Sequence, residues 1–165
     1  MTQYGVYAKF GSYISFQGGY AGDTVRHCIR AQRDSGITAE NAVSGPSRDG
    51  YGVYAALSSH ISAQNVTIND TNTDLLELGG SIFSGYNSKV ECINATITNP
   101  GITIVRCFQA STVSMNSATI SGVRGNGFIC EDGSTVSGIN LVLGAVPDQV
   151  LRLRNNSQLN LLTRS

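Results

Sequence analysis

Acidic side chains are the residues of this chain that are best suited to chemistry. Hydrolysis of a glycosidic bond commonly needs two carboxyl groups that flank the bond, about 5–10 Å apart. Glu131 and Asp132 form the best adjacent pair, but their side chains should diverge if this segment is a strand. Asp34 lies many repeats away from Asp132, and Asp74 and Glu77 fall in a separate segment. The spacing therefore gives candidates for a hydrolase but no complete site.

The basic side chains allow a second type of chemistry. Elimination from an acidic sugar needs a base, together with a group that neutralises the sugar carboxylate. Arg106 and Glu131 could act together in this way, but nothing in their spacing distinguishes them from other charged pairs. His27 and His60 belong to different repeats, so they form no Ser–His–Asp arrangement. We expect no complete active site, with a polysaccharide-degrading hydrolase or lyase as the alternative.

A repeated serine predicts the elements that position these residues. Seven serines lie two residues before an aliphatic residue, with successive steps of 23, 24, 29, 23, 23 and 23 residues. They are Ser12, Ser35, Ser59, Ser88, Ser111, Ser134 and Ser157. A fixed period of this size is typical of stacked repeats. We interpret the serines as structural, because a corner hydroxyl can bond the turn backbone and stack on the next serine.

Each repeat predicts three short strands, which we name A, B and C. Strand A has inward residues at alternate positions, such as Val53 and Ala55, and strand B carries the aliphatic residue that follows the serine. Strand C follows a bend and is clear in the later repeats. Such strands bury a core only when repeats stack. The sequence predicts an all-β, right-handed, single-stranded parallel β-helix of about seven coils, each with three strands.

A bend joins strand B to strand C in each repeat. The bend position includes Asn41, Asn65, Asn94 and Asn140. Asparagine tolerates the left-handed backbone that a sharp bend needs.

The 29-residue step predicts an insertion after strand C, at Asn69–Ser81. Beside it, Lys89 and Glu91 interrupt the small polar face of strand B, and we interpret them as a surface ion pair.

The composition bounds the class of protein. The chain has 165 residues, enough for one domain, and only 13% of them are charged, with a net charge of zero. We therefore expect no nucleic-acid binding, and no apolar run is long enough to predict membrane insertion. The four cysteines match no zinc pattern, so we expect buried free thiols and neither a metal nor a cofactor. Such thiols fit folding in a cytoplasm.

Two coils carry a resemblance to a known family. Residues Tyr51–Ile68 and Gly127–Asn140 look like coils of the pectate-lyase-like right-handed parallel β-helix, and the asparagine column resembles that family's internal asparagine ladder. The phrase Gly-Val-Tyr-Ala followed by Ser-x-Ile-x-Ala-x-Asn is most similar to bacteriophage tailspikes and tail fibres. The likeness extends from about Gly5 to Leu162.

The resemblance implies a homotrimer in a phage virion, folded in the host cytoplasm and joined to other phage tail proteins. It implies recognition of a bacterial surface polysaccharide, capsule or lipopolysaccharide, which many such spikes also cleave. The chain stops just after the bend position of its last repeat. We therefore expect residues 1–165 to be one β-helix domain that is a segment of a longer chain or of a trimer, because exposed coil ends need a cover.

The outward side of strand A carries the residues that we expect to recognise a partner. One column reads Tyr7, Arg30, Tyr54, Phe83, Arg106, Ile129 and Arg152, and the next column includes Phe108. Aromatic rings and guanidinium groups suit sugar rings and acidic sugar groups. The same residue types also bury well between protein chains. A glycan groove and a subunit interface both stay open, and a groove between subunits would satisfy both.

Overall fold

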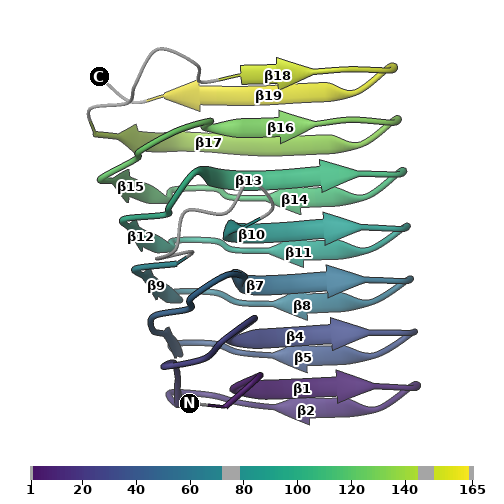
Figure 1. The fold of residues 1–165 in the computed structure, drawn as a ribbon. Helices are drawn as coiled ribbons and strands as arrows, with labels where there is room; N and C mark the ends of the chain where they lie inside the picture. Colours follow the sequence, from purple (N-terminus) through teal and green to yellow (C-terminus); the bar gives the residue numbers. More distant parts are fainter. Residues whose placement is uncertain (1, 72–78, 145–150, 164–165) are drawn as a thin grey trace.

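The structure is a computed structural model that describes residues 2–71, 79–144 and 151–163. Within these ranges every element is a β-strand, and no helix is long and apolar enough to span a membrane. The strands pair in parallel, coil upon coil, in a single column with the N-terminus at one end and the last coil at the other (Figure 1). The predicted all-β parallel β-helix is therefore confirmed.

The A strands form one sheet of seven strands, which we call sheet A. Their order in the sheet follows their order in the chain. They are β1 (Val6–Lys9), β4 (Ile29–Gln32), β7 (Tyr51–Ala56), β10 (Gly80–Gly85), β13 (Thr103–Phe108), β16 (Phe128–Cys130) and β18 (Leu151–Leu153). Parallel strands within the sheet are joined through the B and C strands of the coil, as the three-strand repeat predicts.

The B strands stack into a second ladder, which we call sheet B. They are β2 (Tyr13–Ser15), β5 (Gly36–Thr38), β8 (His60–Ser62), β11 (Lys89–Glu91), β14 (Thr112–Ser114), β17 (Thr135–Leu143) and β19 (Gln158–Thr163). The C strands are β3 (Tyr20–Ala21), β6 (Val43–Ser44), β9 (Thr67–Asn69), β12 (Thr96–Thr98) and β15 (Thr119–Ser121). The long strand β17 serves both ladders, because it pairs with β14 and also with β15.

The core is the column of inward side chains. In the middle coils the inward positions of strands A, B and C, such as Val53, Ile61 and Ile68, are fully buried. All four cysteines are buried and free, as predicted, and burial raises the pKa of the Cys92 thiol to about 12. The hydrogen bond that the Cys107 thiol shares with Cys130, together with burial, raises the pKa of Cys107. The raised pKa values keep the thiols of Cys92 and Cys107 protonated, as core groups and not reactive ones.

From Ser35 to Ser134 the serine column is a buried hydrogen-bond ladder. The backbone N–H of Ser59 donates to the hydroxyl of Ser88 at 3.1 Å, and the N–H of Ser88 donates to the hydroxyl of Ser111 at 3.1 Å. The same bond joins Ser35 to Ser59 and Ser111 to Ser134, at 3.3 Å in each case. The corner hydroxyls therefore satisfy buried backbone donors between coils, and the structural interpretation of the serines is confirmed.

The asparagine column differs from its predicted environment. Asn65 donates its side-chain amide to Asn41 at 3.1 Å, and Asn94 donates to Asn65 at 3.2 Å, so a ladder exists. All three side chains are exposed, however, and their φ angles of 55° show that they occupy the left-handed region. The expectation of an internal ladder was wrong, because a bend in the left-handed conformation turns these side chains outward here.

The insertion is shorter than the range Asn69–Ser81 that the repeat length predicts. Strand β9 runs to Asn69, and Ser81 belongs to β10, which pairs with both β7 and β13. The extra residues therefore fall between these two strands. Asp74 and Glu77 lie outside the described residues.

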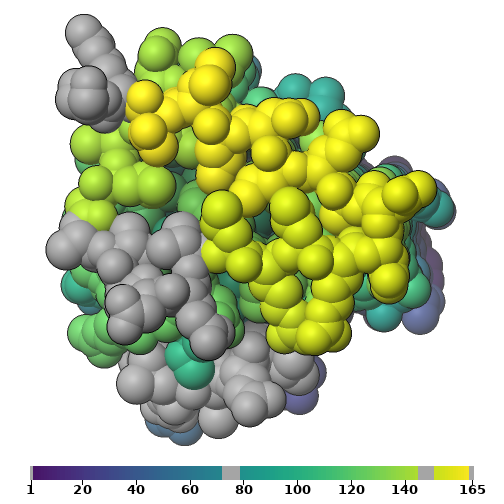
Figure 2. Space-filling view, turned by 90° about the horizontal axis from the view of Figure 1, so that it is seen from above, coloured from purple at the N-terminus to yellow at the C-terminus, as the bar shows by residue number. Residues whose placement is uncertain are grey.

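The last coil covers the C-terminal end of the column, where it is seen from above in Figure 2. Its strands pair on one side only, β18 with β16 and β19 with β17. Leu151, Leu153 and Leu162 are consequently exposed by 59%, 50% and 65%. An unpaired strand with exposed apolar side chains is a surface that proteins usually cover.

Candidate functional site

The predicted outward column of sheet A is in register. Arg30 lies opposite Tyr54, Tyr54 opposite Phe83, and Phe83 opposite Arg106 in adjacent strands. Phe108 lies two residues after Arg106, at the end of strand β13. The repeat length therefore places these side chains on one outer face of the sheet, because residues of one register position in a parallel sheet share a side.

At the N-terminal end of this outward column, the side chains of sheet A contact one another. The Arg30 guanidinium lies 4.6 Å from the ring centre of Tyr4, 4.9 Å from that of Tyr7 and 5.1 Å from that of Tyr54. Its Nη2 also donates to Gln32 at 2.8 Å, and the Tyr7 hydroxyl donates to the same Gln32 oxygen at 3.0 Å. Arg30 and Tyr7 are thus engaged in cation–π and hydrogen-bonded contacts within the chain.

A groove opens where the column meets the loops that lead into strands β4 and β7. Its volume is about 440 Å³. It is lined by Arg26, His27, Asp49, Tyr51, Tyr54, Phe83, Arg106 and Phe108. This size falls in the range of about 300–1,000 Å³ that is usual for small-ligand sites. The structure brings together four of the seven predicted recognition residues in this groove, which we call the sheet A groove.

The aromatic rings of the groove stack on one another. Tyr54 packs parallel to Phe83 with ring centres 4.4 Å apart, and its other neighbour His27 stacks at 4.1 Å. Phe108 meets Phe83 edge-on at 5.3 Å, and Tyr51 contacts Phe83 at 5.1 Å. Rings packed in this way stabilise the wall of the groove and present edges more than faces to a ligand. The rings therefore shape the groove, and its polar groups must provide most of the specificity.

His27 is a neutral polar group in this wall. Burial, with the charges of Arg30 and Arg26, lowers the pKa of His27 to about 3. Its Nδ1 accepts a hydrogen bond of 3.0 Å from the backbone N–H of Tyr51, so the ring proton is on Nε2. The imidazole therefore carries no charge near neutral pH and fixes the start of strand β7.

Three polar atoms of the groove are buried without a hydrogen-bond partner in the described chain. They are Oδ1 of Asp49, the hydroxyl of Tyr51 and Nε of Arg106. Burial raises the pKa of Tyr51 to about 12, although the nearby Arg106 guanidinium acts in the opposite direction. The Tyr51 hydroxyl thus lies beside Arg106 without hydrogen-bond geometry between them. Unpaired buried polar atoms are uncommon, so three around one groove make it the candidate functional site.

Sequence reasoning missed half of the groove. Arg26, His27 and Asp49 lie in loops before strand A, where no periodicity indicates which way a side chain points. Tyr51 has the same parity as the inward Val53, so alternation assigns it to the core. Its ring instead joins an outer cluster with Phe83. The one available signal was the concentration of Arg, His and Asp in the loops that precede β4 and β7.

The predicted catalytic carboxylates do not meet. Glu131 pairs with Arg152 at 3.4 Å and with Arg154 at 3.7 Å, at the C-terminal end of the column. Asp132 sits in a turn with a φ of 56° and accepts a 2.6 Å hydrogen bond from Asn155. Asp34 is exposed in the second coil. The structure thus engages Glu131, Asp132 and Arg152 in structural contacts.

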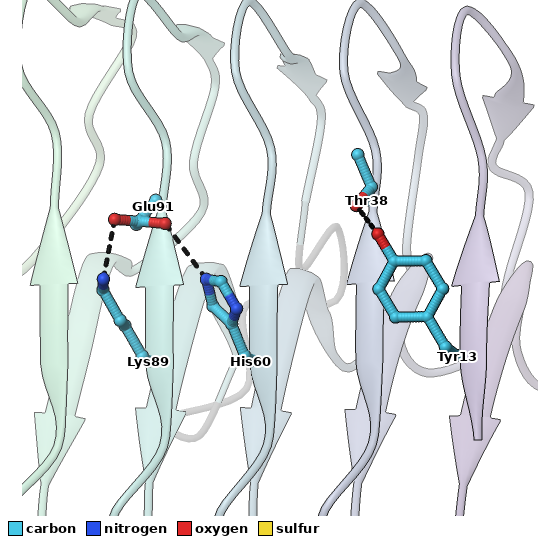
Figure 3. Close-up of polar contacts among 5 residues, drawn as sticks. All are labelled: Tyr13, Thr38, His60, Lys89 and Glu91. Carbon is cyan, nitrogen blue, oxygen red and sulfur yellow. Dashed lines mark hydrogen bonds and ion pairs between the residues drawn. The ribbon is translucent and has the colours of Figure 1, made fainter. Parts of the chain in front are cut away.

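The outer face of sheet B holds a separate polar cluster. Glu91 accepts hydrogen bonds from Lys89 at 2.8 Å and from His60 at 3.0 Å, and Tyr13 bonds Thr38 nearby (Figure 3). The bond from Lys89 is the main reason that the pKa of Glu91 is lowered. The predicted ion pair is present, and His60 extends it. These groups are largely solvated, so we interpret them as a surface cluster.

Among the described residues no metal site accompanies the groove, and the comparisons with known proteins give no match. The described ranges contain no group of three or more His, Cys, Asp or Glu side chains that could hold a metal ion. Comparison of the sequence with models of known protein families gives no match, and comparison with curated proteins gives none either. The groove and the resemblance of the coils are therefore the features that bear on function.

Proposed function

We propose that this chain is a segment of a bacteriophage tailspike or tail fibre that recognises a bacterial surface polysaccharide, capsule or lipopolysaccharide. The single observation that carries the proposal is the sheet A groove, which combines aromatic walls, two arginines and unpaired buried polar atoms. Sites of this kind are effective when a rigid scaffold positions them. The likeness of the coils to tailspikes supplies the biological context.

The shape of sheet A suits a polymer. Seven parallel strands at a spacing of about 4.8 Å give a face roughly 30 Å long. Aromatic and arginine side chains continue along this face from Tyr7 to Arg106. A chain of several sugar units that lay along the face would place one unit in the groove and its neighbours over adjacent coils.

The groove favours binding over hydrolysis. Among the described residues that line it, Asp49 is the one carboxylic acid. Hydrolysis usually needs a pair of carboxyl groups on opposite sides of the bond. Glu131 and Asp132, the pair expected from the sequence, are held by Arg152 and Asn155 away from the groove lining. We therefore prefer recognition to cleavage in this chain.

Assembly belongs to the same proposal. In a phage particle the chain would be part of a homotrimer and would adjoin other tail proteins. The exposed apolar residues of the last coil, Leu151, Leu153 and Leu162, favour a continuation of the column by further protein at this end. The groove lies on the side of the column, on sheet A, so a cover at the end of the column leaves it open.

The test uses the 165-residue chain and a panel of purified capsular polysaccharides and lipopolysaccharides. We expect immobilised polysaccharide of at least one type to retain the chain, with no new reducing ends or unsaturated sugars after prolonged incubation. Failure to bind any member of a broad panel would refute recognition. Release of oligosaccharide that disappears in a Glu131→Ala variant would instead establish the depolymerase alternative.

A further inference from the structure

The unpaired polar atoms of the sheet A groove define which kind of sugar it could hold. Tyr51 is only 3% exposed, yet its hydroxyl has no hydrogen-bond partner in the described chain. Nε of Arg106 and Oδ1 of Asp49 are in the same condition. A buried polar atom that stays unpaired destabilises the fold, so a cluster of them is best explained by a polar ligand that completes their bonds.

The three atoms need different partners. The Arg106 guanidinium only donates hydrogen bonds, and it matches a carboxylate in both charge and planar geometry. The Asp49 carboxylate only accepts, so it requires a donor such as a sugar hydroxyl. The Tyr51 hydroxyl can do either and lies beside Arg106. A ligand that satisfies all three must carry an acidic group and hydroxyl groups on one compact ring.

The charge of the groove agrees with this requirement. Arg26 and Arg106 contribute two positive charges and Asp49 one negative charge, while His27 is neutral. The net charge of the lining is therefore +1, and a ligand with one negative charge would neutralise it. The faces of the Tyr54 ring are occupied by Phe83 and His27, so ring-face stacking with a neutral sugar is a minor contribution.

We propose that the sheet A groove is a subsite for one acidic sugar unit, a pyranose that carries a carboxylate, with Arg106 on the carboxylate and Asp49 and Tyr51 on hydroxyl groups. This proposal rests on the proposed function, because it assigns one unit of the recognised polysaccharide to a defined place. It also assigns a binding role to Asp49 and Tyr51, which the sequence pattern did not select.

Saturation-transfer NMR on the 165-residue chain provides the test. The probes are glucuronate, galacturonate and N-acetylneuraminate, each compared with its methyl ester, which keeps the ring and removes the charge. We expect at least one acid to bind and its ester to bind at least about tenfold more weakly. If none of the acids binds, or if the esters bind equally well, the proposal is overturned.

Three variants locate the binding. Arg106→Gln should weaken binding of the acid about tenfold or more, and Tyr51→Phe should weaken it several-fold without lowering Tm, because the lost hydroxyl has no partner in the protein. Lys89→Gln removes an exposed positive charge from sheet B and serves as the matched control, with unchanged binding expected. Wild-type affinity in both groove variants would overturn the proposal.

Two further outcomes separate this proposal from the proposed function. If the chain binds whole polysaccharide and Arg106→Gln binds it equally well, the acidic subsite is refuted while recognition stands. If Arg106→Gln instead converts an oligomer to a monomer, the groove is an interface between copies of the chain, and the subsite is again refuted. Loss of polysaccharide binding in both groove variants, with unchanged oligomeric state, supports both proposals.

Discussion

At the scale of single residues, the wall of the groove depends on groups held in one protonation state. His27 is kept neutral by burial and by two nearby arginines, and its Nδ1 accepts the N–H of Tyr51 at the start of β7. Protonation of His27 would remove this acceptor and place a third positive charge beside Arg26 and Arg30. The protonation state of His27 therefore affects both the stability of the fold and the shape of the groove.

This coupling gives a prediction for pH. The pKa of His27 is about 3 in the folded chain and about 6.5 when unfolded, so the unfolded state binds the proton first as pH falls. The contribution of His27 is complete above about pH 6.5 and is lost progressively toward pH 3. Urea unfolding should show a loss of up to about 2 kcal/mol between pH 7 and pH 5.

The matched variant for this effect is His27→Asn, whose side-chain oxygen can still accept the Tyr51 N–H. We expect the variant to lose most of the difference in unfolding free energy between the two pH values, because asparagine does not titrate. An equally steep acid dependence in His27→Asn would show that other groups cause it.

Residue-level sequence reasoning succeeded where alternation applies. Tyr54, Phe83 and Arg106 share an outer face because each lies one position after an inward aliphatic residue of strand A. It failed at Asp49 and Tyr51, since a loop has no period and the parity rule breaks where β7 begins. Contacts between coils, such as that of His27 with Tyr54, also depend on loop geometry that one sequence does not encode in a visible pattern.

At the scale of elements, the repeat is held by inward aliphatic side chains and by the corner serines. The hydroxyls of Ser59, Ser88, Ser111 and Ser134 each accept a backbone N–H from the serine of the preceding coil, and all four side chains are buried. The period of the serines could be read from the sequence because this bond recurs once at each coil-to-coil step from Ser35 to Ser134. The outward direction of the asparagine side chains could not be read from the sequence, because a left-handed bend is compatible with a buried or an exposed side chain.

The serine ladder predicts a measurable loss of stability. Ser111→Ala removes the acceptor of the Ser88 N–H and leaves this buried donor unpaired. We expect the free energy of unfolding to fall by about 1–3 kcal/mol. Ser62→Ala, on the half-buried outer side of strand β8, is the control and should change it little. Equal effects of the two variants would argue against a structural role of the ladder.

The register of strand B predicts a larger difference in stability between an inward and an outward substitution. Val113 is 1% exposed, whereas its neighbour Thr112 is exposed. Val113→Asp buries an unpaired charge in the core and should cost several kcal/mol or prevent folding, while Thr112→Asp should cost less than about 1 kcal/mol. Thermal unfolding followed by circular dichroism distinguishes them. Similar melting temperatures for both variants would contradict the register.

At the scale of the whole molecule, the fold could be predicted because one period controls every coil. The function could be predicted only as far as a resemblance and one outward face allow, because a β-helix supports binding, catalysis and assembly alike. The proposed homotrimer predicts that sedimentation equilibrium gives a mass near three times the 17.4 kDa of the chain. A monomer at all concentrations would remove the main support for a tailspike origin.

Hydrogen–deuterium exchange of the chain, with and without the polysaccharide that retains it, tests directly whether the sheet A groove binds the polymer. Recognition through the sheet A groove predicts slower exchange at Tyr51–Ala56 and Thr103–Phe108, with no change at His60–Ser62 on sheet B. Protection confined to sheet B, or no protection with any polysaccharide of the panel, would contradict the account.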